Sequence, residues 1–199
     1  MMRILAATPV PSTGSVEPEC VRSIFSQELP EGYSLDWDFI RGHDVGIQRN
    51  EIVRLAKKGG YSKLLFVDSD VQLPDGALSK LLEWDKPIVM GCVPFKNTKT
   101  GKCSVYLQDT YFNKDKCIKA SELKDLPDIL EVKGGGFGCV LIDMGVFDEI
   151  ESPWFEYTES PSGIRRGEDI SFCYKAAESE IKIFADTRVL CKHKRSDWL

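Results

Sequence analysis

The sequence predicts an α/β protein with a Rossmann-like, mostly parallel sheet flanked by helices and a small β-hairpin excursion. Short apolar runs alternate with segments of helical periodicity through the first half, which is the pattern of parallel strands joined by crossover helices. One of these runs, residues 64–67, ends abruptly in the carboxylates of Asp68 and Asp70. Acidic side chains at the end of a buried strand are typical of the ligand-binding edge of an open α/β sheet.

The strands and helices of the first half follow from apolar runs and from signals that end helices. Two glycines at 59 and 60 end a helix whose apolar residues face inward, and the nearly continuous apolar run 88–93 is typical of a strand buried on both faces. The strands are expected at residues 3–8, 35–40, 63–67 and 87–93, and the helices at 17–27, 45–58 and 74–84.

The second half is more polar. Residues 96–133 are rich in Lys and Asp and contain short β-like pieces at 104–107 and 129–132, which indicates an excursion with a hairpin. Residues 160–163 are expected to form a mobile loop. The remaining elements are expected as strands at 139–143, 181–185 and 189–191 and as helices at 145–150 and 168–179. With no repeat and no linker, residues 1–199 are expected to be a single domain.

The composition excludes several classes of protein. The formal net charge is −5, the sequence pI is about 5.2, and the basic residues are scattered, so we expect no nucleic-acid partner. No stretch approaches the ~20 apolar residues of a membrane helix, and the N-terminus is too short for a signal peptide, so a cytoplasmic protein is expected. The seven cysteines show no C-x-x-C spacing, which predicts reduced thiols that pack as small hydrophobic side chains.

Asp68 and Asp70 are candidate metal ligands. Two like charges at the end of a buried strand need a positive partner. Mg²⁺ and Mn²⁺ prefer oxygen ligands and commonly bind one or two carboxylates together with the phosphates of a substrate. Because side chains alternate along a strand, both carboxylates are expected on the same side of it. The motif therefore predicts a divalent cation and a phosphorylated ligand.

Three further segments are candidate elements of a site. The glycines of residues 134–138 allow a ligand to approach the backbone closely, although they match neither the dinucleotide fingerprint nor the P-loop. Glu168 and Asp169 open an amphipathic helix, where acidic residues are also favoured by the helix macrodipole. His193 lies between two lysines, so its imidazole could bind a metal while the lysines face phosphate.

In this order, the D-x-D motif of Asp68 and Asp70, the glycine-rich segment 134–138, the Glu168–Asp169 pair and His193 resemble the motifs of the GT-A glycosyltransferases. Residues 46–50 are similar to the G-x-x-x-R-N segment of the family 2 enzymes. The resemblance implies a GT-A fold, Mn²⁺ or Mg²⁺ as cofactor, a nucleotide-diphospho-sugar donor of the UDP or GDP type, and a glycan or other hydroxyl acceptor. It also implies a nucleotide-binding half and an acceptor half, at residues 1–93 and 94–199.

The resemblance further implies roles for individual residues. The donor would be bound by Thr8, Pro9, Val10, Asp44, Arg49, Asp68, Ser69 and Lys194. The acceptor would be bound by Gly135, Gly136, Phe137 and Trp154, the metal by Asp68, Asp70 and His193, and catalysis would fall to Asp169 and Glu168. The chain departs from the family at two places: residues 41–44 replace its acidic residue after the second strand, and residues 8–11 shorten its turn after the first.

The resemblance leaves the stereochemistry and two alternatives open. If the enzyme inverts configuration, Asp169 is the general base that takes the proton of the acceptor hydroxyl; if it retains configuration, Asp169 positions the acceptor. Trp154 and its aromatic neighbours could stack on a sugar or belong to the core. The alternatives are a haloacid-dehalogenase-like phosphatase with Asp68 as nucleophile, and a module that binds a nucleotide-sugar or glycan without turnover.

Overall fold

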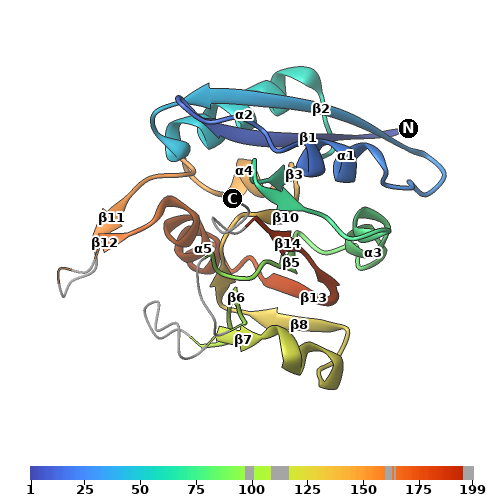
Figure 1. Cartoon of the computed structure of the whole chain (residues 1–199). Coiled ribbons are helices and arrows are strands. Elements are labelled where there is room, and N and C mark those ends of the chain that lie inside the picture. The colour runs from blue at the N-terminus through green and yellow to red at the C-terminus, as the bar shows by residue number, and fades with distance from the viewer. Residues whose placement is uncertain (97–100, 109–116, 160–162, 164, 195–199) are drawn as a thin grey trace.

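A seven-stranded sheet forms the centre of the computed structural model, with the strand order β2-β1-β3-β10-β5-β13-β8 (Figure 1). The structure describes residues 1–96, 101–108, 117–159, 163 and 165–194. The strands of this sheet are β1 (Met2–Pro11), β2 (Tyr33–Gly42), β3 (Lys63–Val67), β5 (Ile88–Cys92), β8 (Ile129–Val132), β10 (Cys139–Asp143) and β13 (Ile183–Leu190).

The sheet is mostly parallel, as the sequence predicts. β1 pairs in parallel with β2 and β3, and β13 pairs in parallel with β5. β10 lies antiparallel between β3 and β5, and β8 is antiparallel to β13 at the edge. Every residue of β3 and β5 is buried, so these strands can be recognised from their apolar runs alone. The runs do not tell whether a neighbouring strand is parallel or antiparallel.

Helices cover both faces of the sheet. The helices are α1 (Pro18–Phe25), α2 (Val45–Gly59), α3 (Ala77–Glu83), α4 (Val146–Glu149), α5 (Glu168–Glu178) and the 3₁₀ helix η2 (Ala120–Asp125). Buried side chains of α1 and α3 pack in one apolar cluster, and those of α2, α4 and α5 pack in another. α2 begins where Asp44 Oδ1 accepts a hydrogen bond from Ile47 N at 2.9 Å, and it ends at Gly60, whose φ of 66° suits glycine.

Small sheets lie outside the central one. β6 (Lys102–Tyr106) forms an antiparallel hairpin with β7 (Cys117–Lys119) and also pairs with β9 (Gly134–Gly135). The predicted hairpin excursion is therefore confirmed, but β8, which was expected within it, joins the central sheet because Val132 and its neighbours pair with β13. β11 (Thr158–Glu159) and β12 (Arg165–Arg166) flank the predicted mobile loop, of which residues 160–162 lie outside the described residues.

The end of the chain differs from the sequence prediction. A single strand, β13, with a break in its pairing register between Asp186 and Leu190, replaces the expected strands at 181–185 and 189–191. A second short strand, β14 (Lys192–His193), follows and pairs antiparallel with β4 (Val71–Gln72). This pairing joins β14 to the segment that follows the D-x-D motif, and it could not be predicted from the local sequence.

All seven cysteines are buried and unbridged, as predicted. Among the helices that the structure describes, none has both the length and the apolar character needed to cross a bilayer.

Candidate active site

The D-x-D motif forms a turn rather than a continuation of the strand. β3 ends at Val67, and Val71 N donates a hydrogen bond to Asp68 O at 3.0 Å. The alternation of a strand therefore no longer applies, and the prediction that both carboxylates share one side is wrong. Asp68 turns toward α2 and α5, whereas Asp70 turns toward β14.

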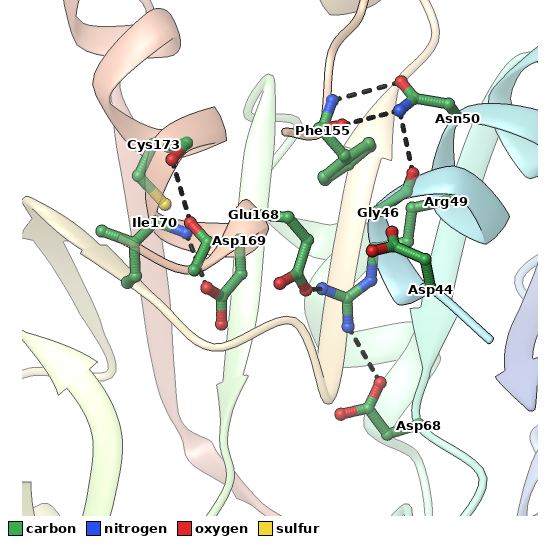
Figure 2. Close-up of polar contacts among 12 residues, drawn as sticks. Asp44, Gly46, Arg49, Asn50, Asp68, Phe155, Glu168, Asp169, Ile170 and Cys173 are labelled. Atoms are coloured by element: carbon green, nitrogen blue, oxygen red, sulfur yellow. Dashed lines mark hydrogen bonds and ion pairs between the residues drawn. The ribbon is translucent and has the colours of Figure 1, made fainter. Parts of the chain in front are cut away.

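Arg49 lies at the centre of a buried charge cluster that Figure 2 shows. Its Nη2 donates to Asp68 Oδ1 at 3.0 Å, and its Nη1 donates to Glu168 Oε1. The Arg49 side chain is only 3% exposed. Its guanidinium carbon also lies 5.4–6.0 Å from the ring centroids of Phe66, Phe137 and Phe155. A cation buried this deeply requires paired carboxylates, so Arg49 ties together α2, the end of β3 and the start of α5.

Asp169 lies beside this cluster in the first turn of α5. Desolvation, followed by the negative charge of Glu168, raises the pKa of Asp169 to about 7, although Arg49 opposes the shift. Its Oδ1 accepts a hydrogen bond from Ile170 N at 2.7 Å, and the residue is partly exposed. A carboxylate with a pKa near neutrality can accept a proton from a neutral hydroxyl more readily than an ordinary one.

Asp70 and His193 form a second cluster. His193 Nε2 lies 3.2 Å from Asp70 Oδ1, and Lys96 Nζ forms an ion pair with Asp70 Oδ2. Burial tends to raise the pKa of Asp70, but the contacts with His193 and Lys96 outweigh it and lower the pKa to about 2. His193 Nδ1 lies 2.7 Å from Pro94 O, which can only accept, so Nδ1 carries the proton. In the neutral ring, Nε2 is then the atom with a free lone pair.

The pairing of β4 with β14 positions this cluster. His193 lies opposite Val71 in the register, and Lys194 N donates to Asp70 O at 3.0 Å. A cavity of about 620 Å³ opens alongside, between the first turn of α1, β4 and residues 192–194. Lys194, predicted to bind the donor, lies on this cavity, where its Nζ pairs with Glu17.

The three predicted metal ligands do not converge. Within the described part of the chain, no group of three His, Cys, Asp or Glu side chains is arranged to hold a metal ion. Asp68 is engaged by Arg49, which leaves Asp70 and His193 as an oxygen and nitrogen donor set. The Asp70 carboxylate already forms an ion pair with the ammonium group of Lys96. This pair fits a Mn²⁺ or Mg²⁺ ion that takes its other ligands from water and phosphate.

The residues predicted to bind the donor at the end of β1 are buried. Trp37 Nε1 donates to Thr8 Oγ1 at 3.1 Å, and Gln48 Nε2 donates to Val10 O at 3.0 Å. Pro9 is buried between them. The remaining predicted donor residues have structural partners too: Ser69 O accepts from Glu17 N at 2.8 Å, and Asp44 caps α2.

The residues predicted to bind the acceptor divide into two kinds. Phe137 and Trp154 have 1% and 7% of their surface exposed, so their side chains belong to the core and do not line an acceptor site. The glycines lie closer to the chemistry. A Cβ on Gly136 would come 3.6 Å from Asp169 Oδ2, whereas one on Gly135 would clash with Ser104 O at 2.6 Å. The glycine-rich segment thus passes close to both β6 and Asp169.

Sequence reasoning missed two partners of the site. Lys96 and Pro94 lie at the start of the polar excursion, and only the fold brings them to Asp70 and His193. Asn50 follows Arg49 and was noted only as part of a motif. It holds α2 to Phe155, because its Nδ2 donates to Phe155 O at 2.7 Å and its Oδ1 accepts from Phe155 N at 3.1 Å (Figure 2).

Comparison with solved structures identifies the fold. The crystal structure of A197 from STIV aligns with a TM-score of 0.63 at 19% identity, over 98% of this chain and 86% of that chain. The crystal structure of GalNAc-T7 with UDP, GalNAc and Mn²⁺ aligns with a TM-score of 0.64 at 11% identity, over 99% of this chain. This chain spans 45% of the GalNAc-T7 chain. No protein-family profile matches the sequence, and no curated protein matches it.

The chain therefore has the GT-A fold, as the sequence motifs imply. The alternative of a haloacid-dehalogenase-like phosphatase needs Asp68 as a free nucleophile. Asp68 is instead held by a buried guanidinium within a GT-A sheet, so neither the fold nor the site supports that alternative.

Proposed function

We propose that this chain is a cation-dependent glycosyltransferase that moves a sugar from a nucleoside diphosphate to an acceptor hydroxyl. The observation that carries the proposal is the partly exposed Asp169, whose pKa is raised to about 7 and which lies beside the glycine-rich segment of a GT-A sheet. A carboxylate of this kind is suited to activate a hydroxyl, and a GT-A fold supplies the setting in which such a hydroxyl meets a nucleotide-sugar.

The donor side of the reaction would use Asp70 and His193. These two side chains would hold Mn²⁺ or Mg²⁺, whose charge would stabilise the diphosphate as it leaves. The protonated Nδ1 of His193 donates to Pro94 O and so orients Nε2 for this purpose, which is the usual role of a second hydrogen bond on a metal-binding histidine. The GalNAc-T7 structure that shares the fold contains UDP and Mn²⁺, which supports a donor of the nucleoside diphosphate type.

The acceptor side would use Asp169. If the reaction inverts configuration, the Asp169 carboxylate takes the proton of the acceptor hydroxyl as the new glycosidic bond forms. If the reaction retains configuration, Asp169 accepts a hydrogen bond from that hydroxyl and positions it. Glu168, which pairs with Arg49, would act on Asp169 through its charge rather than touch the substrate.

A donor panel tests the proposal. The chain is incubated with UDP-, GDP-, CDP- and dTDP-sugars, with and without Mn²⁺, and released nucleoside diphosphate is measured. We expect release from one class of donor, dependent on the cation and lost in Asp169→Asn when a hydroxyl acceptor is supplied. Asp148→Asn, on an exposed carboxylate that pairs with Lys57, is the matched control and should be fully active. Binding of donor without any release would favour the alternative of a non-catalytic module.

A further inference from the structure

We propose that Lys96 is a built-in competitor for the divalent cation at Asp70, so that the cation and the diphosphate bind this site cooperatively. This inference rests on the proposed function and concerns the regulation of the same site. Its basis is that one carboxylate is shared: Asp70 Oδ1 faces His193 Nε2 at 3.2 Å, while Asp70 Oδ2 is paired with Lys96 Nζ.

The backbone that leads to Lys96 is held in place, whereas the Lys96 side chain can leave Asp70. Phe95 N donates to Lys102 O at 2.9 Å, and Ser104 N donates to Val93 O at 2.8 Å, so residues 93–95 are held against the start of the hairpin excursion. The Lys96 side chain is 48% exposed and has a flexible four-carbon stem. The ammonium can therefore swing away from Asp70 without unfolding its surroundings.

His193 would keep its orientation when Lys96 leaves. The hydrogen bond that orients the imidazole goes to Pro94 O, a backbone atom two residues before Lys96. Lys194 N also holds Asp70 O at 3.0 Å through the backbone. The donor set of Asp70 and His193 is thus held by the main chain of this region, while the lysine charge on Asp70 comes from the half-exposed side chain of Lys96.

The charges then dictate the order of events. An ammonium and a divalent cation cannot share one carboxylate without strong repulsion, so cation binding requires Lys96 to break its ion pair. A diphosphate gives the released ammonium a new anionic partner at the same edge of the sheet. The nucleoside diphosphate should therefore strengthen cation binding, and by linkage the cation should strengthen nucleotide binding.

Titration of Mn²⁺ into the intact chain, followed by calorimetry or by the loss of free Mn²⁺ signal in electron paramagnetic resonance, tests this proposal without any sugar donor. We expect Lys96→Met to bind Mn²⁺ about three- to tenfold more tightly than the wild type, because no ion pair has to break. Addition of UDP should tighten Mn²⁺ binding in the wild type and do so less in Lys96→Met. The matched control is Lys182→Met, which removes an exposed lysine that pairs with Glu131 and not with Asp70; it should behave as the wild type.

Equal or weaker Mn²⁺ binding by Lys96→Met would overturn the competitor role and leave the transferase proposal standing. Undetectable Mn²⁺ binding by both proteins would overturn it as well, since Asp70 would then hold no cation. UDP that binds the wild type equally with and without Mn²⁺ would also contradict it. Lys96→Gln, with thermal unfolding of each variant, separates these results from any loss of folding.

Discussion

Asp68 and Asp70 lie in one turn, but one pairs with a buried arginine and the other with a half-exposed lysine. Asp68 is paired with Arg49, which is 3% exposed, surrounded by aromatic rings and shared with Glu168. Asp70 is paired with Lys96, which is 48% exposed and held by no aromatic cage among the described contacts. The first pair cannot come apart without stranding charge in the interior, whereas the second can exchange its cation. We therefore propose that Asp68 belongs to the scaffold of the site and that Asp70 serves its binding function.

The largest expected effect is the loss of stability when the buried Arg49 is replaced. Arg49→Met leaves Glu168 buried without its cation, which should lower the free energy of unfolding by about 3–5 kcal/mol. Urea denaturation measures the change. The control is Arg54→Met on the same helix, where a half-exposed arginine pairs with Glu51, and its effect should stay within about 0.5 kcal/mol. Similar losses in both variants would show that the buried cluster does not stabilise the fold.

The next effect concerns Asp169, whose pKa is shifted by the charges of Glu168 and Arg49. Asp169→Asn should slow sugar transfer by about 10²–10⁴-fold, because the amide cannot accept the hydroxyl proton. In the wild type, the rate should rise with pH as Asp169 ionises near its pKa of about 7. A transfer rate independent of pH between about 5 and 9, with full activity in the variant, would remove Asp169 from the reaction.

The raised pKa of Asp169 also predicts how the stability of Asp169→Asn depends on pH. The pKa of Asp169 is raised by folding from 3.8 to about 7, so the folded state binds more protons than the unfolded state in this window. Stability contributed by the protonated form is therefore lost as the pH rises through the window. Asp169→Asn should be more stable than the wild type at pH 8 by about 1–3 kcal/mol, with no difference near pH 4. Thermal unfolding at both pH values measures it.

The smallest effect compares the two aspartates directly. Asp68→Asn leaves the buried Arg49 with one carboxylate fewer and should destabilise the protein by about 1–3 kcal/mol. Asp70→Asn breaks the contacts with Lys96 and His193 that lower the pKa of Asp70 to about 2, but the lysine is half exposed, so the loss at neutral pH should be smaller, up to about 2 kcal/mol. Urea denaturation of the two variants side by side gives the answer. The reverse order would mean that the scaffold and binding roles are exchanged.

Much of the sheet could be predicted because its strands carry their own signals. The buried runs that became β3 and β5 are apolar whatever lies beside them, and Gly60 ends α2 through its own backbone preference. The antiparallel direction of β10 and the pairing of β4 with β14 could not be predicted, because both depend on partners far away in the sequence.

The site was predictable in its acidic residues but not in their partners. The D-x-D motif, Asp169 and His193 could be identified by residue type. Lys96 is one of many lysines in a polar segment, and only the fold shows that it pairs with Asp70. Phe137 follows three glycines that reach the site, yet its ring turns inward to pack with Phe66 and Phe155. The proposed halves also interleave, since His193, from the second half, contacts Asp70 from the first.

The donor side of the proposed reaction requires Asp70 and His193 to bind a nucleoside diphosphate through a divalent cation. Thermal shift of the wild type and Asp70→Ala, with UDP- and GDP-sugars in the presence and absence of Mn²⁺, tests this directly, because a ligand of the folded state raises its melting temperature. We expect a rise in the wild type that needs both Mn²⁺ and the nucleotide-sugar and that disappears in Asp70→Ala. An equal rise in Asp70→Ala without Mn²⁺ would contradict it.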